Sequence, residues 1–270
     1  MDFRLFENII DSFSPTLFYL NLYFQGEPFL HPSFTDMVKY AKSKGIIVAT
    51  STNGHYLDSE NAKKTIESGL DTLIVSLDGA DETTYQQYRN GGKFIEVISG
   101  IKEIVKQKVI AGSNKPRIIL QSLMLKSNSE QFKEIRQLGK ELGVDKVEFK
   151  TAQFYEFENG NPLMPDESFS RYKRVVGSSK ETVQYKIRNR MPNHCFRMWS
   201  SAVITWDRKM VPCCFDKDAS LVMGDLNKDS MIDSWKNETY KEFRKKILRS
   251  RKSIDICRNC SEGTGISLFF

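Results

Sequence analysis

Residues 46–54, IIVATSTNG, and residues 72–79, TLIVSLDG, share one pattern: a short apolar run that ends in small polar residues and a glycine. Runs of this length that are rich in Val and Ile and stop at a turn signal are typical of buried strands. Residues 59–68, which lie between them, have the spacing of an amphipathic helix. The order strand, helix, strand predicts neighbouring parallel strands.

The same alternation continues in both directions along the chain. Further strands are expected at 16–24, 117–125 and 146–150. Further helices are expected at 2–13, 33–43, 93–108 and 129–142. Short apolar strands that alternate with amphipathic helices predict an α/β fold around a parallel sheet, either doubly wound or barrel-like.

Beyond residue 150 the pattern changes. Residues 151–194 are rich in Asn, Pro and acidic residues, and we expect a long loop with one short helix near 166–176. A domain boundary near residue 190 divides the chain into domains 1–190 and 191–270. The second domain should contain a hairpin that turns at Asp207–Lys209 and a basic helix at about 230–249.

Composition limits the function classes. The 270 residues carry a formal charge of +6 and contain no apolar run near the roughly 20 residues that a membrane helix needs. Residues 1–10, MDFRLFENII, lack a basic region followed by an apolar stretch, so we expect no secretory signal. The basic segment 241–252 has an apolar stripe and lacks interleaved stacking aromatics, so we interpret it as a solvated helix face. These features predict a cytoplasmic protein with no membrane partner and make a nucleic-acid partner unlikely.

Three successive strands end in polar motifs: Gln25–Pro28, Ser51–Gly54 and Ser76–Gly79. Ligands of parallel α/β folds bind at the carboxyl ends of the strands. These motifs would suit a small polar ligand that carries amino, carboxylate and hydroxyl groups. The alternative is that Asn-Gly and Asp-Gly are ordinary turns.

All five cysteines lie in the last third of the chain, at 195, 213, 214, 257 and 260. An odd count and a Cys-x-x-Cys pair favour a metal or cluster site in a reducing compartment over a disulfide framework. Four thiolates, from Cys195, Cys213, Cys257 and Cys260, fit tetrahedral zinc and an iron–sulfur cluster about equally well. We expect Cys214 to be a buried free thiol, although it could exchange roles with Cys213.

Several longer motifs together resemble a known family. The segments FQGEPFLHPSF (24–34), TSTNG (50–54) and VSLDGADETTYQQYR (75–89) resemble radical S-adenosylmethionine (SAM) enzymes. The C-terminal cysteines, with MVPCCFD at 210–216, resemble the SPASM/twitch extension, which holds auxiliary iron–sulfur clusters. The resemblance implies a partial (βα)6-type TIM-like barrel with a small Cys-rich hairpin and helix domain.

The resemblance also implies roles for individual residues. Gly26, Glu27 and Pro28 match the segment that binds the amino group of S-adenosylmethionine, and Thr52 and Asn53 match the next strand end. Ser76 and Asp78 match a position that contacts the ribose or carboxylate of this cofactor. Cys195, Cys213, Cys257 and Cys260 match the ligands of one auxiliary [4Fe-4S] cluster, which favours a cluster over zinc.

The chain also departs from the family pattern. It has no cysteine before Cys195, whereas the family carries a Cys-x-x-x-Cys-x-x-Cys segment whose cluster cleaves S-adenosylmethionine. We therefore expect a fragment of a longer protein or a degenerate member, which does not cleave S-adenosylmethionine alone. Gln25 and Arg208 replace glycines of the pattern, and Arg208 should strain its turn. No cysteine follows Cys260, so only one cluster can be held.

The function that the resemblance implies is that of an oxidoreductase or maturase. It would act on a peptide or small molecule through a 5′-deoxyadenosyl radical and use a cellular electron donor. The alternative is a non-enzymatic α/β scaffold with a four-Cys zinc domain.

Overall fold

The computed structural model describes residues 1–176 and 183–263. The chain forms two compact units. The first, here named the sheet unit, comprises Phe3–Ala152 and Pro162–Ser170. The second, the cysteine unit, comprises Met1–Asp2, Gln153–Asn161 and the chain from Arg171 onward. The boundary near residue 190 remains a prediction about domains, because these units group residues by contact alone.

The sheet unit is built on five parallel strands in the order β1-β2-β3-β4-β5. They are β1 (Tyr19–Asn21), β2 (Ile47–Thr52), β3 (Thr72–Ser76), β4 (Arg117–Met124) and β5 (Lys146–Thr151). Each strand lies beside its neighbour in sequence, as successive strand–helix units do in a barrel. The α/β prediction is confirmed.

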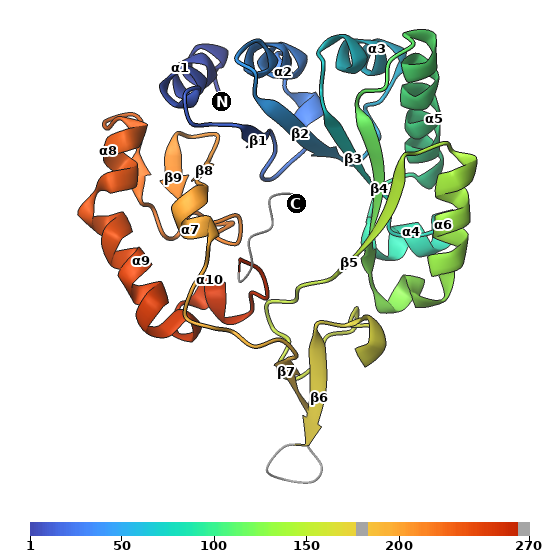
Figure 1. The fold of residues 1–270 in the computed structure, drawn as a ribbon. Helices are drawn as coiled ribbons and strands as arrows, with labels where there is room; N and C mark the ends of the chain where they lie inside the picture. The colour runs from blue at the N-terminus through green and yellow to red at the C-terminus, as the bar shows by residue number, and fades with distance from the viewer. Residues whose placement is uncertain (177–182, 264–270) are drawn as a thin grey trace. The chain divides into compact units, whose positions relative to one another are not determined.

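Helices cover one face of this sheet (Figure 1). They are α1 (Phe3–Phe13), α2 (Phe34–Ser43), α3 (Ser59–Glu67), α4 (Glu82–Tyr88), α5 (Phe94–Ile110) and α6 (Phe132–Glu141). The side chains of Val48, Leu73, Val75 and Leu120 on the helix-covered face are fully buried. A Cβ on Gly139 of α6 would collide with Val147 Cγ2 of β5, so helix and sheet pack closely there.

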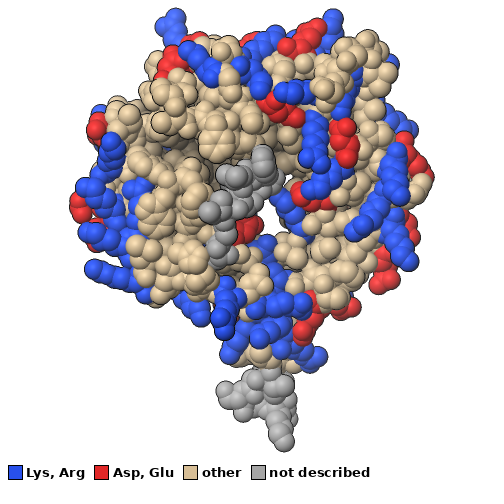
Figure 2. Space-filling view, in the orientation of Figure 1, with Lys and Arg blue, Asp and Glu red and all other residues tan. Residues whose placement is uncertain are grey.

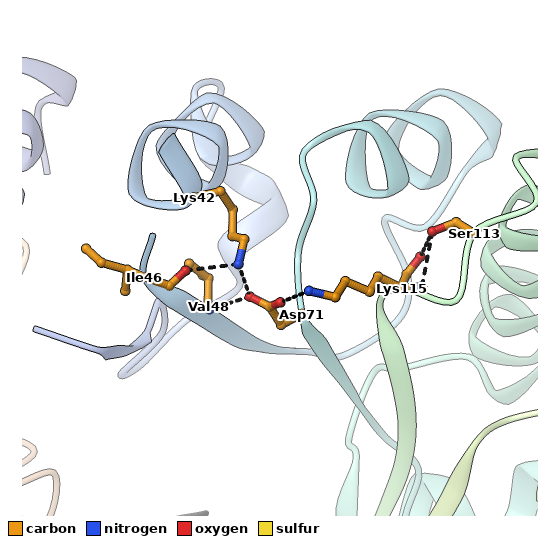
Figure 3. Close-up of polar contacts among 6 residues, drawn as sticks. All are labelled: Lys42, Ile46, Val48, Asp71, Ser113 and Lys115. Carbon is orange, nitrogen blue, oxygen red and sulfur yellow. Dashed lines mark hydrogen bonds and ion pairs between the residues drawn. The ribbon is translucent and has the colours of Figure 1, made fainter. Parts of the chain in front are cut away.

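Asp71 joins the amino-terminal ends of three strands (Figure 3). Its Oδ2 accepts a hydrogen bond from the Val48 N–H at 2.8 Å and pairs with Lys42 Nζ at 2.6 Å. Its Oδ1 pairs with Lys115 Nζ, just before β4, at 2.5 Å. In barrel folds this end of the strands serves stability, whereas the opposite end carries function.

The described part of the cysteine unit contains two small antiparallel sheets and four α-helices. The sheets pair β6 (Tyr172–Val176) with β7 (Val183–Ile187), and β9 (Lys209–Val211) with both β8 (Val203–Ile204) and β10 (Gly224–Asp225). The helices are α7 (Arg197–Ser200), α8 (Met231–Lys236), α9 (Glu238–Ser250) and α10 (Asp255–Arg258). Arg208 has φ 72° in the β8–β9 turn, which confirms the expected strain.

The interpretation of α9 as an amphipathic surface helix is confirmed for most of its length. Tyr240, Phe243 and Ile247 are buried, whereas Lys245 and Lys246 are exposed. Lys and Arg side chains accordingly gather along the outer edge of the part that carries α9 (Figure 2). The expected single helix at 230–249 is divided, because Asn237 ends α8 and caps α9 by accepting from the Tyr240 N–H.

The structure differs from the predicted elements in three further places. The strand expected at 16–24 pairs only over Tyr19–Asn21. Helix α4 was not expected; Asp81 caps it by accepting from the Thr84 N–H at 2.8 Å. The helix expected near 166–176 is instead a short 3₁₀ turn followed by strand β6, in which Val175 has the β-branched side chain that strands favour.

Candidate functional site

Glu27 is the centre of the first candidate site, at the carboxyl ends of β1 and β2. Its Oε1 accepts from the Thr52 hydroxyl at 2.8 Å and from the Phe29 N–H at 3.2 Å. Its Oε2 accepts from the Asn53 N–H at 2.7 Å. The predicted residues Glu27, Thr52 and Asn53 therefore meet at one strand end, as the sequence indicated.

The backbone around Glu27 is shaped by two features of the sequence. Gly26 has φ 78°, a left-handed conformation that glycine adopts without strain, and no atom lies within 4 Å of the place where a Cβ would stand. Pro28 begins a short 3₁₀ turn, where its missing N–H costs nothing. The segment Gly26–Pro28 thus presents an open, partly exposed loop above the strand end.

His55 supports the neighbouring turn. Its Nε2 accepts from the Lys93 N–H at 3.0 Å, so the ring proton is on Nδ1, which lies 3.2 Å from Asn53 Oδ1. Asn53 Oδ1 also accepts from the His55 N–H at 3.0 Å. The Asn-Gly turn expected as the alternative does form, and Asn53 of this turn also contacts Glu27.

Ser76 and Asp78, at the end of β3, have different surroundings. Thr52 lies opposite Val75 in the sheet register, so Asn53 and Ser76 follow on adjacent strands. Ser76 is partly exposed. The Asp78 side chain is only 1% exposed, and its Oδ2 pairs with Arg89 Nε at 2.6 Å.

Both oxygens of Asp78 are bound by the protein, because Oδ1 accepts from the Leu123 N–H at 2.6 Å. The described contacts of this carboxylate therefore hold β3, β4 and the end of α4 together. Its role as a cofactor contact remains a prediction that this geometry does not favour. The partly exposed guanidinium of Arg89, held by Asp78, is the polar group that reaches the surface.

A row of polar side chains runs across the sheet face opposite the helices. Ser76 is in register with Gln121, and Gln121 with Glu148. Gln121 Nε2 donates to Glu148 Oε2 at 3.0 Å. All three are partly exposed, so this face can contact a polar ligand.

The second candidate site is a pocket in the cysteine unit. It is lined by Cys195, Met198, Cys213, Phe215, Phe243, Ile247, Arg251, Ile256, Cys257 and Cys260. Cys195 precedes α7, Cys213 follows β9, and α10 carries Cys257 with Cys260 just after it. Each of the four cysteines predicted as ligands therefore lines the same pocket.

The rest of the pocket lining is mainly apolar. Apart from the four cysteines and Arg251, it consists of Met198, Phe215, Phe243, Ile247 and Ile256. An apolar shell of this kind limits the access of solvent to a metal site. Among residues 1–176 and 183–263, no group of three or more His, Cys, Asp or Glu side chains is positioned to hold a single ion.

Three of the pocket thiols have raised pKa values. Burial raises the pKa of Cys257 to about 12 and also raises the pKa of Cys260, while the nearby Arg251 acts in the opposite direction. A hydrogen bond with Cys214 and burial raise the pKa of Cys213. Because thiolates are the ligating form, cluster binding must release protons here.

Cys214 is exposed, so the expectation of a buried thiol was wrong. A hydrogen bond with Cys213 lowers the pKa of Cys214 to about 7. Arg197 Nη1 lies 3.8 Å from its sulfur. Cys213 lines the pocket and Cys214 does not, which favours Cys213 as the ligand.

Comparison with known proteins agrees with this geometry. The model of the radical SAM superfamily matches residues 20–139, and the model of the SPASM iron–sulfur cluster-binding domain matches residues 195–261. The chain belongs to the radical SAM superfamily and carries a SPASM domain. The family's cofactors are [4Fe-4S] clusters and S-adenosylmethionine, and these are the groups to consider at the two sites.

Individual relatives differ in how much they share. A tungsten-containing aldehyde ferredoxin oxidoreductase cofactor-modifying protein of Pyrococcus furiosus is 27% identical over 97% of this chain and 79% of its own length. An AdoMet-dependent heme synthase of Methanosarcina barkeri is 30% identical over 44% of this chain, which is 32% of that protein.

Among solved structures, anSMEcpe with bound AdoMet superposes with a TM-score of 0.67 at 14% identity, over 99% of this chain and 79% of that one. This likeness confirms the partial-barrel fold class.

Within the described residues no helix is long and apolar enough to cross a membrane.

Two arginine side chains at the sites, those of Arg89 and Arg251, were not predicted from the sequence as site residues. Arg89 lay in a quoted motif, but its pairing with Asp78 is a tertiary contact. Arg251 lay in the basic run assigned to solvent.

Proposed function

We propose that this chain functions within an oxidoreductase or maturase of the radical SAM/SPASM type that acts on a peptide or a small molecule, and that alone, with no cysteine before Cys195, it does not cleave S-adenosylmethionine. The observation that carries the proposal is the pocket around which Cys195, Cys213, Cys257 and Cys260 gather. The P. furiosus relative is described as cofactor-modifying, and another anSMEcpe structure as bound to AdoMet and a peptide. These descriptions support both substrate classes.

The four cysteines would hold one auxiliary [4Fe-4S] cluster. When bound, such a cluster supplies electron transfer or an anchor for the substrate. The apolar side chains of Met198, Phe243 and Ile247 would exclude water from it. An electron donor from the cell would be its redox partner.

The strand-end site would hold S-adenosylmethionine, the source of the 5′-deoxyadenosyl radical in this family. Glu27 and the exposed loop at Gly26 and Pro28 would receive the amino group, since a carboxylate stabilises an ammonium ion. Asn53 and Ser76 would present polar groups to the rest of the cofactor.

The first experiment tests the cluster. The chain is reconstituted anaerobically with iron and sulfide, and absorbance near 400 nm and metal content are measured. About four irons per chain are expected for a [4Fe-4S] cluster. Cys257→Ala should lose the cluster, whereas Cys214→Ala is the matched control and should keep it. Stoichiometric zinc without iron would contradict the proposal and support the scaffold alternative.

The second experiment tests the cofactor site by calorimetric titration of S-adenosylmethionine into the reconstituted protein. Glu27→Gln should weaken binding, because its amide would place N–H groups against the Asn53 N–H. S-adenosylhomocysteine, which lacks the sulfonium charge, serves as the comparison ligand. Equal binding by wild type and variant would refute the role of Glu27.

A further inference from the structure

Arg251 is an unusual member of the cysteine pocket. It is 1% exposed and ranks first by volume among the fully buried side chains of the described residues. It begins the short 3₁₀ turn that follows α9 and lines the pocket together with the four cysteines. A guanidinium cannot lose its charge in a protein, so this buried position holds a permanent cation.

The outer nitrogens of Arg251 contact three backbone carbonyls, and its side chain also interacts with the thiols of Cys257 and Cys260. Nη1 donates to the His194 oxygen at 3.0 Å, and Nη2 donates to the Glu262 oxygen at 2.5 Å and lies 3.4 Å from the Cys260 oxygen. These carbonyls belong to the segments that carry Cys195 and Cys260. Arg251 therefore ties together the backbone on two sides of the pocket.

The charge of Arg251 has no carboxylate partner within residues 1–176 and 183–263. Glu262, whose backbone oxygen Arg251 contacts, pairs its carboxylate with Arg197 at 2.7 Å. The Nε atom of Arg251 is also buried without a hydrogen-bond partner among the described residues. Leaving a charge and a donor of this kind unpaired in the interior is costly, so a negative acceptor in the pocket is the missing counterpart.

Cluster-bound sulfurs would supply that acceptor. We propose that Arg251 is a positioning residue that raises the reduction potential of the auxiliary cluster, with its Nε–H directed to a cluster or cysteine sulfur. This inference rests on the proposed function, since it requires the four cysteines to hold a cluster. Reduction adds one negative charge to the cluster, and a nearby buried cation stabilises the reduced form more than the oxidised form.

A purely structural role is the competing explanation. The three carbonyl contacts alone would hold the pocket walls, and their loss would lower stability and cluster content. Such a role predicts no change in the potential of those clusters that do assemble. The reduction potential therefore separates the two explanations.

The test is an EPR-monitored redox titration of reconstituted wild type, Arg251→Met and Arg251→Lys. At the wild-type midpoint, the ratio of reduced to oxidised cluster in Arg251→Met should fall at least tenfold, which corresponds to about 59 mV for one electron. Arg251→Lys keeps the charge and should recover most of the shift. Arg258→Met is the matched control: it removes a half-exposed charge beside the same cysteines, and its shift should be much smaller.

Iron content is measured on every sample, so failure of cluster assembly in the wild type would count against the proposed function and not against the role of Arg251. Equal midpoints for wild type and an iron-loaded Arg251→Met would overturn the inference. If Arg251→Met holds no iron, the inference is tested instead on wild-type protein labelled with 15N-arginine. Pulsed EPR of its reduced cluster should show guanidinium nitrogen coupling, and its absence would overturn the inference.

Discussion

The hydroxyl group of Tyr172 lies 2.9 Å from Oδ1 of Asn259, the residue immediately before Cys260. The same hydroxyl accepts from the Phe154 N–H at 2.8 Å, and Asn259 Nδ2 donates to the Phe154 carbonyl. Both Tyr172 and Asn259 are buried. This closed set of hydrogen bonds joins the Cys257–Cys260 segment to the loop at Phe154.

We therefore expect Tyr172→Phe to weaken the cluster site without removing a ligand. The variant leaves the Phe154 N–H and Asn259 Oδ1 without their shared partner, at a cost of about 1–3 kcal/mol in unfolding free energy. Iron content after desalting should fall below that of wild type, as measured by metal analysis. Tyr155→Phe is the control, because Tyr155 is 55% exposed. Unchanged stability and iron content would show that the hydrogen bonds of Tyr172 do not stabilise the cluster site.

Thr52 offers a sharper test of the cofactor site than Glu27 itself. Its hydroxyl donates to Glu27 Oε1 and accepts from the Gly54 N–H at 3.0 Å. Thr52→Val has nearly the same shape, but it leaves the Gly54 N–H unpaired and removes one of the two hydrogen bonds to Glu27 Oε1, so binding of S-adenosylmethionine should weaken about tenfold. Thr52→Ser keeps the hydroxyl and should bind within about twofold of wild type. Calorimetry that finds equal affinity for Val and Ser would exclude this role.

Asp78 should behave as a structural residue. Asp78→Asn leaves Arg89 without its charged partner and should lower the unfolding free energy by about 3 kcal/mol, measured by urea denaturation. The double variant Asp78→Asn with Arg89→Met removes the unpaired charge and should recover part of this loss. Wild-type stability in Asp78→Asn, combined with lost cofactor binding, would instead support the role that the family resemblance implies.

The sequence could predict the strands, most helices and the strand-end motifs because these depend on local periodicity and turn residues. Val48, Val75 and Leu120 lie in apolar runs that a reader can recognise without any tertiary information. The grouping of Cys195, Cys213, Cys257 and Cys260 around one pocket could be predicted, because few functions other than metal binding explain their spacing in a chain of this kind.

The parts that could not be predicted depend on contacts between distant segments. Arg251 lies in the same basic run as Lys245 and Lys246, and no local pattern distinguishes the buried residue from the exposed ones. Cys213 and Cys214 are adjacent in the sequence, and which of the two thiols lines the pocket depends on the path of the chain after β9. Strand β6 gains its stability by pairing with β7, so its short sequence alone was ambiguous.

Asp71, at the end of the sheet away from the strand-end site, should make stability depend on pH. Burial by itself would raise its pKa, but the hydrogen bonds from Lys115, Lys42 and the Val48 N–H outweigh burial, so the pKa is lowered. A carboxyl group with a lowered pKa stabilises the fold above its unfolded value of about 3.9. This contribution is lost as the pH falls from that value through the folded pKa.

The measurement compares the unfolding free energies of wild type and Asp71→Asn between pH 7 and pH 2.5. Wild type should be more stable at neutral pH, and the difference should shrink as Asp71 becomes protonated. Asp36→Asn is the control, because Asp36 is exposed on α2 of the same unit. A difference that is constant with pH would mean that Asp71 acts through its shape and neutral hydrogen bonds. A difference that shrinks only for Asp71→Asn would assign this part of acid sensitivity to the charged junction of the strand ends.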